Sequence, residues 1–150
     1  MLISTRGRYA LRVMVELAER GSGNFVPLRE ISESQGISVK YLESIASELS
    51  KAGLLEGQHG KGGGYKLAVP PEKISVKSVL CVTEGHVSPV ACLKNSPNAC
   101  ERAKNCRTLP LWEKLYDLID DFFENVTVHE LAKGNLAETN LAVGRKAKTL

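Results

Sequence analysis

The sequence predicts a mainly α-helical chain with a small β-hairpin wing, arranged as a winged helix-turn-helix that is followed by one long helix. Three observations lead to this fold class. Two amphipathic segments flank a short glycine-containing turn, a glycine-rich tip separates two short alternating segments, and an apolar stripe at helical spacing lies near the end of the chain. The 150 residues suffice for one core, or for a small module with an appended dimerisation element.

The composition is that of a soluble globular protein, with 43% hydrophobic and 25% charged residues. No apolar run approaches the roughly 20 residues that a membrane span requires. The N-terminus lacks the apolar core and cleavage site of a signal peptide, so we expect a cytoplasmic protein without a membrane partner. The net charge of +3 is too small to indicate nucleic-acid binding by itself, so a DNA-binding surface would depend on where the charges lie.

The first part of the chain predicts three helices. Apolar residues at helical spacing indicate a first helix over residues 4–20, and a second, shorter helix over 27–35 that Gly36 ends. Ser38 is then the expected N-cap of a third helix, which Gly53 ends. The second and third helices with their tight turn form a helix-turn-helix, although such a pair also occurs in helical domains that do not bind DNA.

A β-hairpin wing is expected after the third helix. Residues 54–56 and 65–67 read as two short strands, and four of the five residues at positions 60–64 are glycines. His59 and Lys61 at this tip can reach phosphates or a minor groove. A nucleotide-phosphate loop is the alternative, but it needs a preceding strand and a helix that follows, and neither is predicted here.

The prolines that follow Val69 mark the end of the first module. We expect a winged helix-turn-helix DNA-binding domain at 1–69, a dimerisation region at 70–134 and a flexible tail at 135–150. Within the second region, Ser75 caps a short helix that Gly85 ends.

A long helix is predicted over residues 111–126. Its apolar stripe consists of Leu111, Leu115, Leu118, Ile119, Phe122 and Val126. A chain of this size has little core left to cover so wide a stripe, so burial against a second copy is expected, and the protein is predicted to be a homodimer. Thr127 and Glu130 form a possible capping box for a last short helix that ends at Gly134.

Three cysteines lie in the irregular loop at residues 86–110. Cys92, Cys100 and Cys106 follow the spacing C-x7-C-x5-C. In a reducing cytoplasm such cysteines are free, metal-bound or redox-active rather than paired in structural disulfides. Thiolates bind iron–sulfur clusters and zinc, and three in one loop can converge on one centre, although the C-x2-C knuckles usual for zinc are missing. A thiol switch without metal remains open.

Three cysteines are one ligand short of a complete site. Cys81, His86, a residue of the other subunit and an external ligand such as water or a small thiol are the candidates for the fourth ligand. Cys81 is better explained as a small buried side chain of its helix, and His86 as a surface histidine.

Several segments together resemble the Rrf-type bacterial winged-helix regulators, the family of IscR, NsrR, RirA and CymR, and above all its IscR branch. These segments are the STRGRYAL opening at 4–11, the ISVKYLE helix start at 37–43, the GGGY wing at 62–65 and the three-cysteine loop. The resemblance covers about residues 1–133.

The resemblance implies a homodimeric transcription factor, acting as a repressor or a dual regulator, that binds a palindromic operator in double-stranded promoter DNA. It implies an iron–sulfur cluster on the three cysteines, with [2Fe–2S] favoured over [4Fe–4S]. The alternative is a CymR-like regulator of the same fold that senses thiol redox state, zinc or a partner protein without a cluster.

The resemblance also assigns roles to single residues. The residues placed in the major groove are Ser38, Lys40, Tyr41, Glu43 and Ser44. His59 takes the place of the basic wing residue that enters the minor groove in the IscR branch, and Lys61 and Arg8 are further candidate DNA contacts. The resemblance also implies that both fourth cluster ligands familiar from the family are missing here, because Leu109 stands in place of a histidine and Arg8 in place of an acidic residue.

An enzyme is not predicted. The sequence shows no paired carboxylates, no nucleophile–base set and no phosphate-binding strand–loop–helix. With histidines at positions 59, 86 and 129 only, a catalytic centre would have to be built from the cysteine loop itself.

Overall fold

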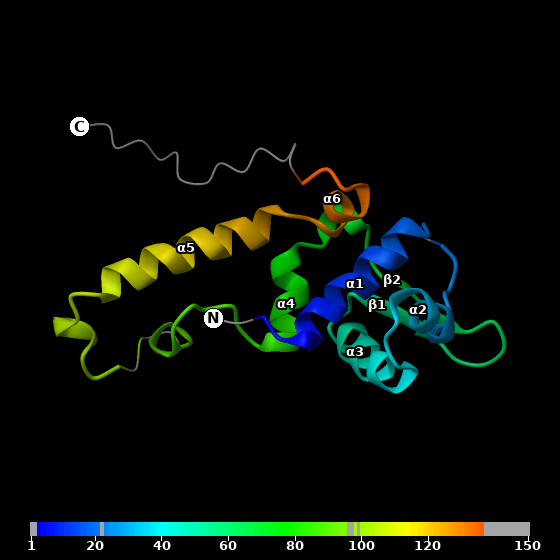
Figure 1. The fold of residues 1–150 in the computed structure, drawn as a ribbon, viewed down its shortest axis with the longest axis horizontal. Coiled ribbons are helices and arrows are strands. Elements are labelled where there is room, and N and C mark those ends of the chain that lie inside the picture. Colours follow the sequence, from blue (N-terminus) through cyan, green and yellow to red (C-terminus); the bar gives the residue numbers. More distant parts are fainter. Residues whose placement is uncertain (1–2, 22, 96–97, 99, 137–150) are drawn as a thin grey trace.

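The structure, a computed structural model, describes residues 3–21, 23–95, 98 and 100–136, so nearly all of the predicted tail at 135–150 lies outside the described residues. In that part the chain forms helices and one two-stranded antiparallel sheet, which confirms the predicted fold class (Figure 1). In chain order the elements are α1 (Thr5–Glu19), α2 (Leu28–Gln35), α3 (Val39–Lys51), β1 (Leu55–Gln58), β2 (Gly64–Leu67), α4 (Val76–Glu84), α5 (Leu109–Asn125) and α6 (Val128–Lys133). None of these helices has the length and hydropathy needed to cross a membrane.

The helix ends follow the capping residues of the sequence. Ser38 accepts a hydrogen bond from the backbone N–H of Tyr41, as expected of an N-cap, and Gly36 closes α2 in the left-handed conformation at φ 64°. The helix-turn-helix of α2 and α3 is therefore present. The predicted capping box of Thr127 and Glu130 is also formed at the start of α6.

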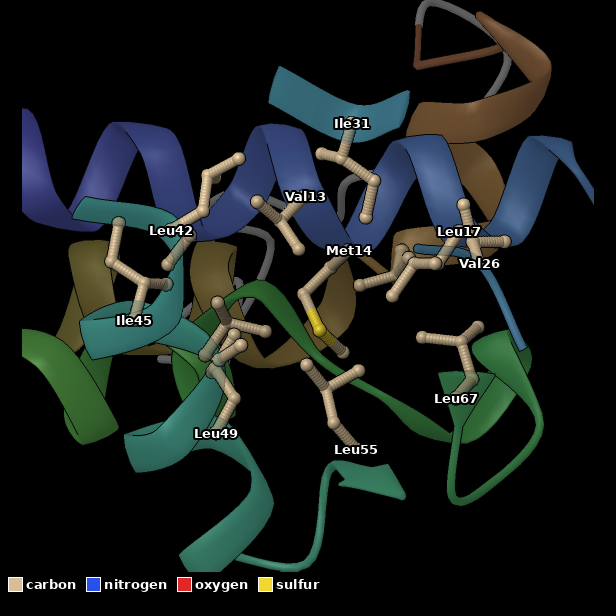
Figure 2. Close-up of a cluster of buried hydrophobic side chains, with 14 of the residues drawn as sticks. Val13, Met14, Leu17, Val26, Ile31, Leu42, Ile45, Leu49, Leu55 and Leu67 are labelled. Atoms are coloured by element: carbon tan, nitrogen blue, oxygen red, sulfur yellow. The ribbon is translucent and has the colours of Figure 1, made fainter. Parts of the chain in front are cut away.

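One core joins α1, α3 and the hairpin (Figure 2). The side chain of Met14 lies between the helices and the sheet and is fully buried. Around it the cluster contains Val13, Leu17, Val26, Ile31, Leu42, Ile45, Leu49, Leu55 and Leu67. Burying one such side chain contributes about 1.5–3 kcal/mol to folding, so this cluster is the main support of the helix-turn-helix.

The segments after residue 69 share this core. Ile74, Val79 and Val128 are completely buried in the same cluster as α1 and α3. The backbone N–H of Val128 donates to the carbonyl of Ile74 at 2.9 Å, and that of Val76 donates to Val126 at 2.8 Å. The division into a DNA-binding part and a dimerisation part is therefore a proposal about roles, because α4 and α6 pack into the same core as the first module.

The long helix α5 packs on the rest of the chain only through part of its length. Val126 just after its C-terminus is buried in a second cluster with Val76, Leu80 and Val87. By contrast, Leu111 is 59% exposed, and Leu115 and Leu118 are also exposed. Figure 1 shows α5 running away from the other helices. The predicted apolar stripe is therefore buried at Val126 and exposed to solvent at Leu111, Leu115 and Leu118.

A polar network holds α2 against α1. The buried carboxylate of Glu16 accepts hydrogen bonds from Ser34 at 2.7 Å, from Arg20 at 2.8 Å and from the side-chain amide of Gln35. Arg12 donates to the side-chain oxygen of Gln35 at 2.8 Å. Burial opposes ionisation of this carboxyl, but the hydrogen bonds outweigh that effect and lower the pKa of Glu16. Because Ile31 is the one buried side chain of α2, this network does much to fix the helix.

We expect Glu16→Gln to lower the free energy of unfolding by about 1–3 kcal/mol at pH 7, since charge-assisted hydrogen bonds are lost. A carboxyl whose pKa is lowered by folding stabilises the protein above its unfolded pKa, and that contribution disappears as the pH falls through the lower, folded value. The difference between wild type and variant should therefore shrink below about pH 4.

Urea unfolding followed by circular dichroism at pH 7 and at steps down to pH 3 measures this difference. Glu19→Gln, an exposed position on the same helix, is the matched control. Equal stability of the two variants at pH 7 would contradict the role of the network.

Candidate DNA-binding surface and cysteine loop

The first turns of α3 present most of the predicted major-groove residues to solvent. Ser38, Lys40, Glu43 and Ser44 are all exposed. They belong to the start of a helix whose opposite face is buried in the core, so their placement is set by the packing of α3. An exposed helix face of this kind can enter a major groove, where such polar side chains can contact base edges and phosphates.

Tyr41 differs from its neighbours because it is half-buried. Its ring packs edge-on against the ring of Tyr9, with centroids 5.8 Å apart and an interplanar angle of 78°. The guanidinium of Arg6 lies 5.9 Å from the centroid of the Tyr41 ring. Part of this side chain therefore supports the contact between α1 and α3.

Arg6 was not singled out from the sequence. Its Nε donates to Glu48 Oε2 at 3.0 Å and its Nη2 donates to Ser44 Oγ at 2.8 Å, so it joins the first turn of α1 to the exposed face of α3. The two helices are far apart in sequence and helical spacing reveals only contacts within one helix, so no pattern could have indicated this pair. The neighbouring Arg8 is exposed and donates to Thr5 Oγ1 at 3.0 Å.

Both predicted DNA-contacting side chains of the wing tip are exposed to solvent. His59 and Lys61 are exposed, next to Gly60 at φ 91° and Gly62 at φ 77°. Glycine is the residue that reaches this region of φ without strain, which accounts for the composition of the tip. The tip is thus free to approach a nucleic acid backbone.

The base of the wing is tied to the segment before α2. Val26 and Tyr65 exchange two backbone hydrogen bonds of 2.9 Å each. A Cβ at Gly64 would lie 2.2 Å from the carbonyl oxygen of Val26, so only glycine permits this close approach. Lys66 on the same strand pairs with Glu56 at 3.2 Å. The tip therefore extends from a firmly held base.

The three loop cysteines are free thiols near the surface. Cys92 lies in a 3-10 turn at Ala91–Leu93, and Cys106 follows another at Ala103–Asn105. Cys100 is exposed, and the other two are half-buried. Among the described residues, no three potential ligands lie close enough together to form a metal site. The donor chemistry suits an iron–sulfur cluster, because such clusters are held by thiolates, but the three thiols are not gathered around one point.

Neighbouring hydrogen bonds change the acidity of the Cys106 thiol. Its Sγ lies 3.3 Å from Thr108 Oγ1, directly before the first turn of α5. Hydrogen bonds from the Thr108 side chain and backbone, and then from the backbone of Leu109, lower the pKa of this thiol. A larger thiolate fraction favours both metal binding and reaction with oxidants.

The two weaker candidates for a fourth ligand lie elsewhere. Cys81 is half-buried on α4, where burial is the main cause that raises the pKa of its thiol and therefore disfavours the metal-binding thiolate. His86 follows α4, and its Nδ1 lies 3.3 Å from Ser88 Oγ. Together with Glu84 and Lys94, His86 lines a pocket of about 270 Å³ beside the start of the loop.

The contact between Glu84 and Ser4, like that of Arg6 with α3, was not indicated by the sequence. Its carboxylate accepts from the backbone N–H of Ser4 at 3.1 Å and from the Ser4 hydroxyl at 2.5 Å. A Cβ at Gly7 would lie 2.4 Å from Glu84 Oε1, so glycine makes room for this carboxylate. The last turn of α4, immediately before the cysteine loop, is thereby fixed to the N-cap of α1.

The chain is similar to known transcriptional regulators. The sequence model of the Rrf2 family, described as an iron-dependent transcriptional regulator, matches residues 3–134. The HTH-type transcriptional regulator IscR of Vibrio cholerae serotype O1 is 39% identical over 135 residues, which make up 90% of this chain and 77% of that protein. IscR of Pectobacterium carotovorum subsp. carotovorum is 38% identical over 131 residues, or 87% of this chain and 79% of that protein.

Solved structures extend the likeness to the fold. CymR, the global cysteine regulator of B. subtilis, matches with a TM-score of 0.74 and 34% identity, over 89% of this chain and 98% of that one. IscR of T. potens matches with a TM-score of 0.71 and 30% identity, over 92% and 90%. The resemblance inferred from sequence motifs is therefore confirmed, and the chain belongs to the Rrf2 family of DNA-binding transcriptional regulators.

Proposed function

We propose that this chain is a homodimeric regulator whose operator binding is controlled by an iron–sulfur cluster on Cys92, Cys100 and Cys106. The observation that carries the proposal is the place of these free thiols. They lie in one loop between α4, which packs into the winged-helix core, and α5, whose leucines face solvent. The similarity to the IscR regulators supports the same reading. The protein would act in the cytoplasm, where promoter DNA lies.

The DNA reader would be α3 with the wing. In a homodimer two copies of α3 would face successive major grooves, so the operator would be a palindrome in double-stranded DNA. The proposed major-groove contacts are Ser38, Lys40, Tyr41, Glu43 and Ser44. His59 and Lys61 would approach the backbone or the minor groove, and Arg8 would contact a phosphate.

The homodimer would form along α5. Leu111, Leu115 and Leu118 lie on one side of this helix and are exposed. Burying such residues against the same helix of a second copy removes apolar surface from water and closes a two-fold interface. Residues 70–134 would in this sense form the dimerisation region, and 1–69 the DNA-binding region.

The cysteine loop would be the sensor. An iron–sulfur cluster, [2Fe–2S] rather than [4Fe–4S], supplies a redox-active and labile centre whose presence reports oxidants or the supply of iron and sulfur. Convergence of the three thiolates would fix the loop against the first turn of α5 and bias the distance between the two reading helices. The fourth ligand would be Cys81, His86, a residue of the partner or an external ligand. His86 is favoured over Cys81, because burial raises the pKa of the Cys81 thiol and so disfavours the thiolate that binds a metal.

The second candidate keeps the DNA reader but not the cluster. The match to CymR, which is named a cysteine regulator, and the lowered pKa of Cys106 favour a regulator that responds to thiol oxidation or to a partner protein. Iron and acid-labile sulfide per chain, measured after oxygen-free purification, separate the two candidates. Iron with an equal amount of sulfide supports the cluster, and an iron-free protein that resists reconstitution supports the thiol sensor.

Replacing any one loop cysteine by serine should remove most of the bound iron, because three thiolates are already one ligand short. Cys92→Ser, Cys100→Ser and Cys106→Ser are compared by iron content and by visible absorption. Cys81→Ser tests the fourth ligand: it should keep its iron if His86 or an external group completes the site, and a loss of iron would identify Cys81 as that ligand. A Cys100→Ser protein with a full complement of iron would contradict the proposed ligand set.

Leu115→Glu should convert the dimer to a monomer, because the new carboxylate would be buried without a partner in the apolar interface. Light scattering after size exclusion gives the mass, and circular dichroism verifies that the helices persist. Leu136→Glu, also at an exposed leucine but beyond α6, should leave the dimer intact. A monomeric wild type, or a dimeric Leu115→Glu protein, would argue against α5 as the interface.

Lys40→Ala should weaken operator binding about 5- to 100-fold, because it removes a cation from the start of the proposed reading helix. Fluorescence anisotropy with operator DNA at fixed salt measures the dissociation constant. Lys51→Ala removes the same charge from the exposed far end of α3 and should change binding less than about twofold. Equal effects at both positions would indicate that general charge, rather than the start of α3, determines affinity.

A further inference from the structure

The guanidinium of Arg6 holds two side chains of α3 at once. Its Nε donates to Glu48 Oε2 at 3.0 Å, and its Nη2 lies 2.8 Å from Glu48 Oε1, which makes a two-point ion pair. The same Nη2 donates to the Ser44 hydroxyl at 2.8 Å. The Arg6 side chain is only 24% exposed, so this geometry is held by packing as well as by charge.

The contact with Arg6 determines how the Ser44 hydroxyl can hydrogen-bond to a further group. This hydroxyl accepts a hydrogen bond from Arg6 on one of its two lone pairs, and among the described residues no acceptor takes its proton. A hydroxyl dipole next to a cation turns its oxygen toward the charge and its hydrogen away from it. Because Ser44 is exposed, its O–H is therefore presented outward as a hydrogen-bond donor.

The four bases differ in the hydrogen-bond donors and acceptors that they present in the major groove. Guanine offers N7 and O6, adenine offers N7 and thymine offers O4 as acceptors, whereas cytosine offers an amino donor. The second lone pair of the Ser44 oxygen lies beside the Arg6 cation, which repels a further donor, so Ser44 acts mainly as a donor. Such a side chain is satisfied best by guanine, adenine or thymine and least by cytosine.

We infer that Arg6 is a positioning residue for specificity: it orients Ser44 as a hydrogen-bond donor, so that the operator base opposite Ser44 is selected against cytosine. This inference rests on the proposed function, in which α3 reads the major groove. Without Arg6, the hydroxyl can turn inward, either to the carboxylate of Glu48 one turn further along α3 or to a carbonyl of the preceding turn. The selection against cytosine would then be lost.

The experiment uses the full chain and an operator obtained by selection from random DNA. Each operator position is changed in turn to the other three bases, and dissociation constants are measured for wild type, Ser44→Ala, Arg6→Met and the double variant. Ser44→Ala identifies the position that Ser44 contacts, where the wild type should disfavour cytosine by about three- to tenfold, the worth of one hydrogen bond.

Arg6→Met should lose this selection at that position only, and the double variant should lose no more than either single variant. Glu48→Gln, which removes the ion pair but leaves the donor to Ser44, should keep the selection. Lys51→Met is the control for the loss of a positive charge. Thermal unfolding by circular dichroism verifies that each variant is folded, and Arg6→Lys, which keeps the charge, should retain part of the selection if Arg6→Met is unstable.

Three outcomes would overturn the inference. If Arg6→Met keeps the wild-type base preference, Arg6 does not orient Ser44. If it instead weakens binding to all sequences alike and reduces the slope of log affinity against log salt by about one, Arg6 contacts a phosphate. A wild type that binds every sequence equally would overturn the proposed reader together with this inference, whereas the first two results leave the proposed reader intact.

Discussion

A two-residue antiparallel contact between the segments at 74–76 and 126–128 determines how the molecule is put together. Two backbone hydrogen bonds of 2.8 and 2.9 Å join these segments, which are separated in sequence by α4, the cysteine loop and α5. The contact buries Ile74, Val126 and Val128 and brings α6 onto α1. The cysteine loop and α5, which follow α4 out of the core, must therefore return to it at this one place.

This constraint fixes the C-terminal end of α5 but not its start. Lys77 of α4 donates to Asp120 at 2.9 Å and lies 3.5 Å from Glu124, which holds the last turns of α5 against α4. The hydrogen bond to Asp120, opposed by burial, raises the pKa of Lys77 and so favours its charged form. The first turns of α5 carry exposed leucines and follow the loop directly. This arrangement suits the proposed sensor. The cysteine loop precedes the start of α5, far from the contacts that hold its C-terminal end, so a change in the loop can move the start of the helix.

Much of this fold follows from local patterns in the sequence. The caps Ser38 and Thr127, the left-handed Gly36 and the glycine-rich wing are all encoded within a few residues, and each was predicted from those residues. The contacts of Arg6 and Glu84 were not predictable, because each joins helices that are distant in sequence through side chains of ordinary surface type. The separation of the three thiols was not predictable either, since spacing shows which residues can converge and not where an irregular loop places them.

The proposed DNA-reading surface likewise combines a locally encoded helix with contacts from a helix that is distant in sequence. The core fixes α3 as a rigid body through Leu42, Ile45 and Leu49, and any sequence with that apolar stripe would do the same. What the exposed face offers to DNA then depends on a side chain from α1, because Arg6 donates to the Ser44 hydroxyl and pairs with Glu48. Specificity in this chain would therefore be a property of the α1–α3 pair, and substitutions on α1 would alter base preference without touching the helix that enters the groove.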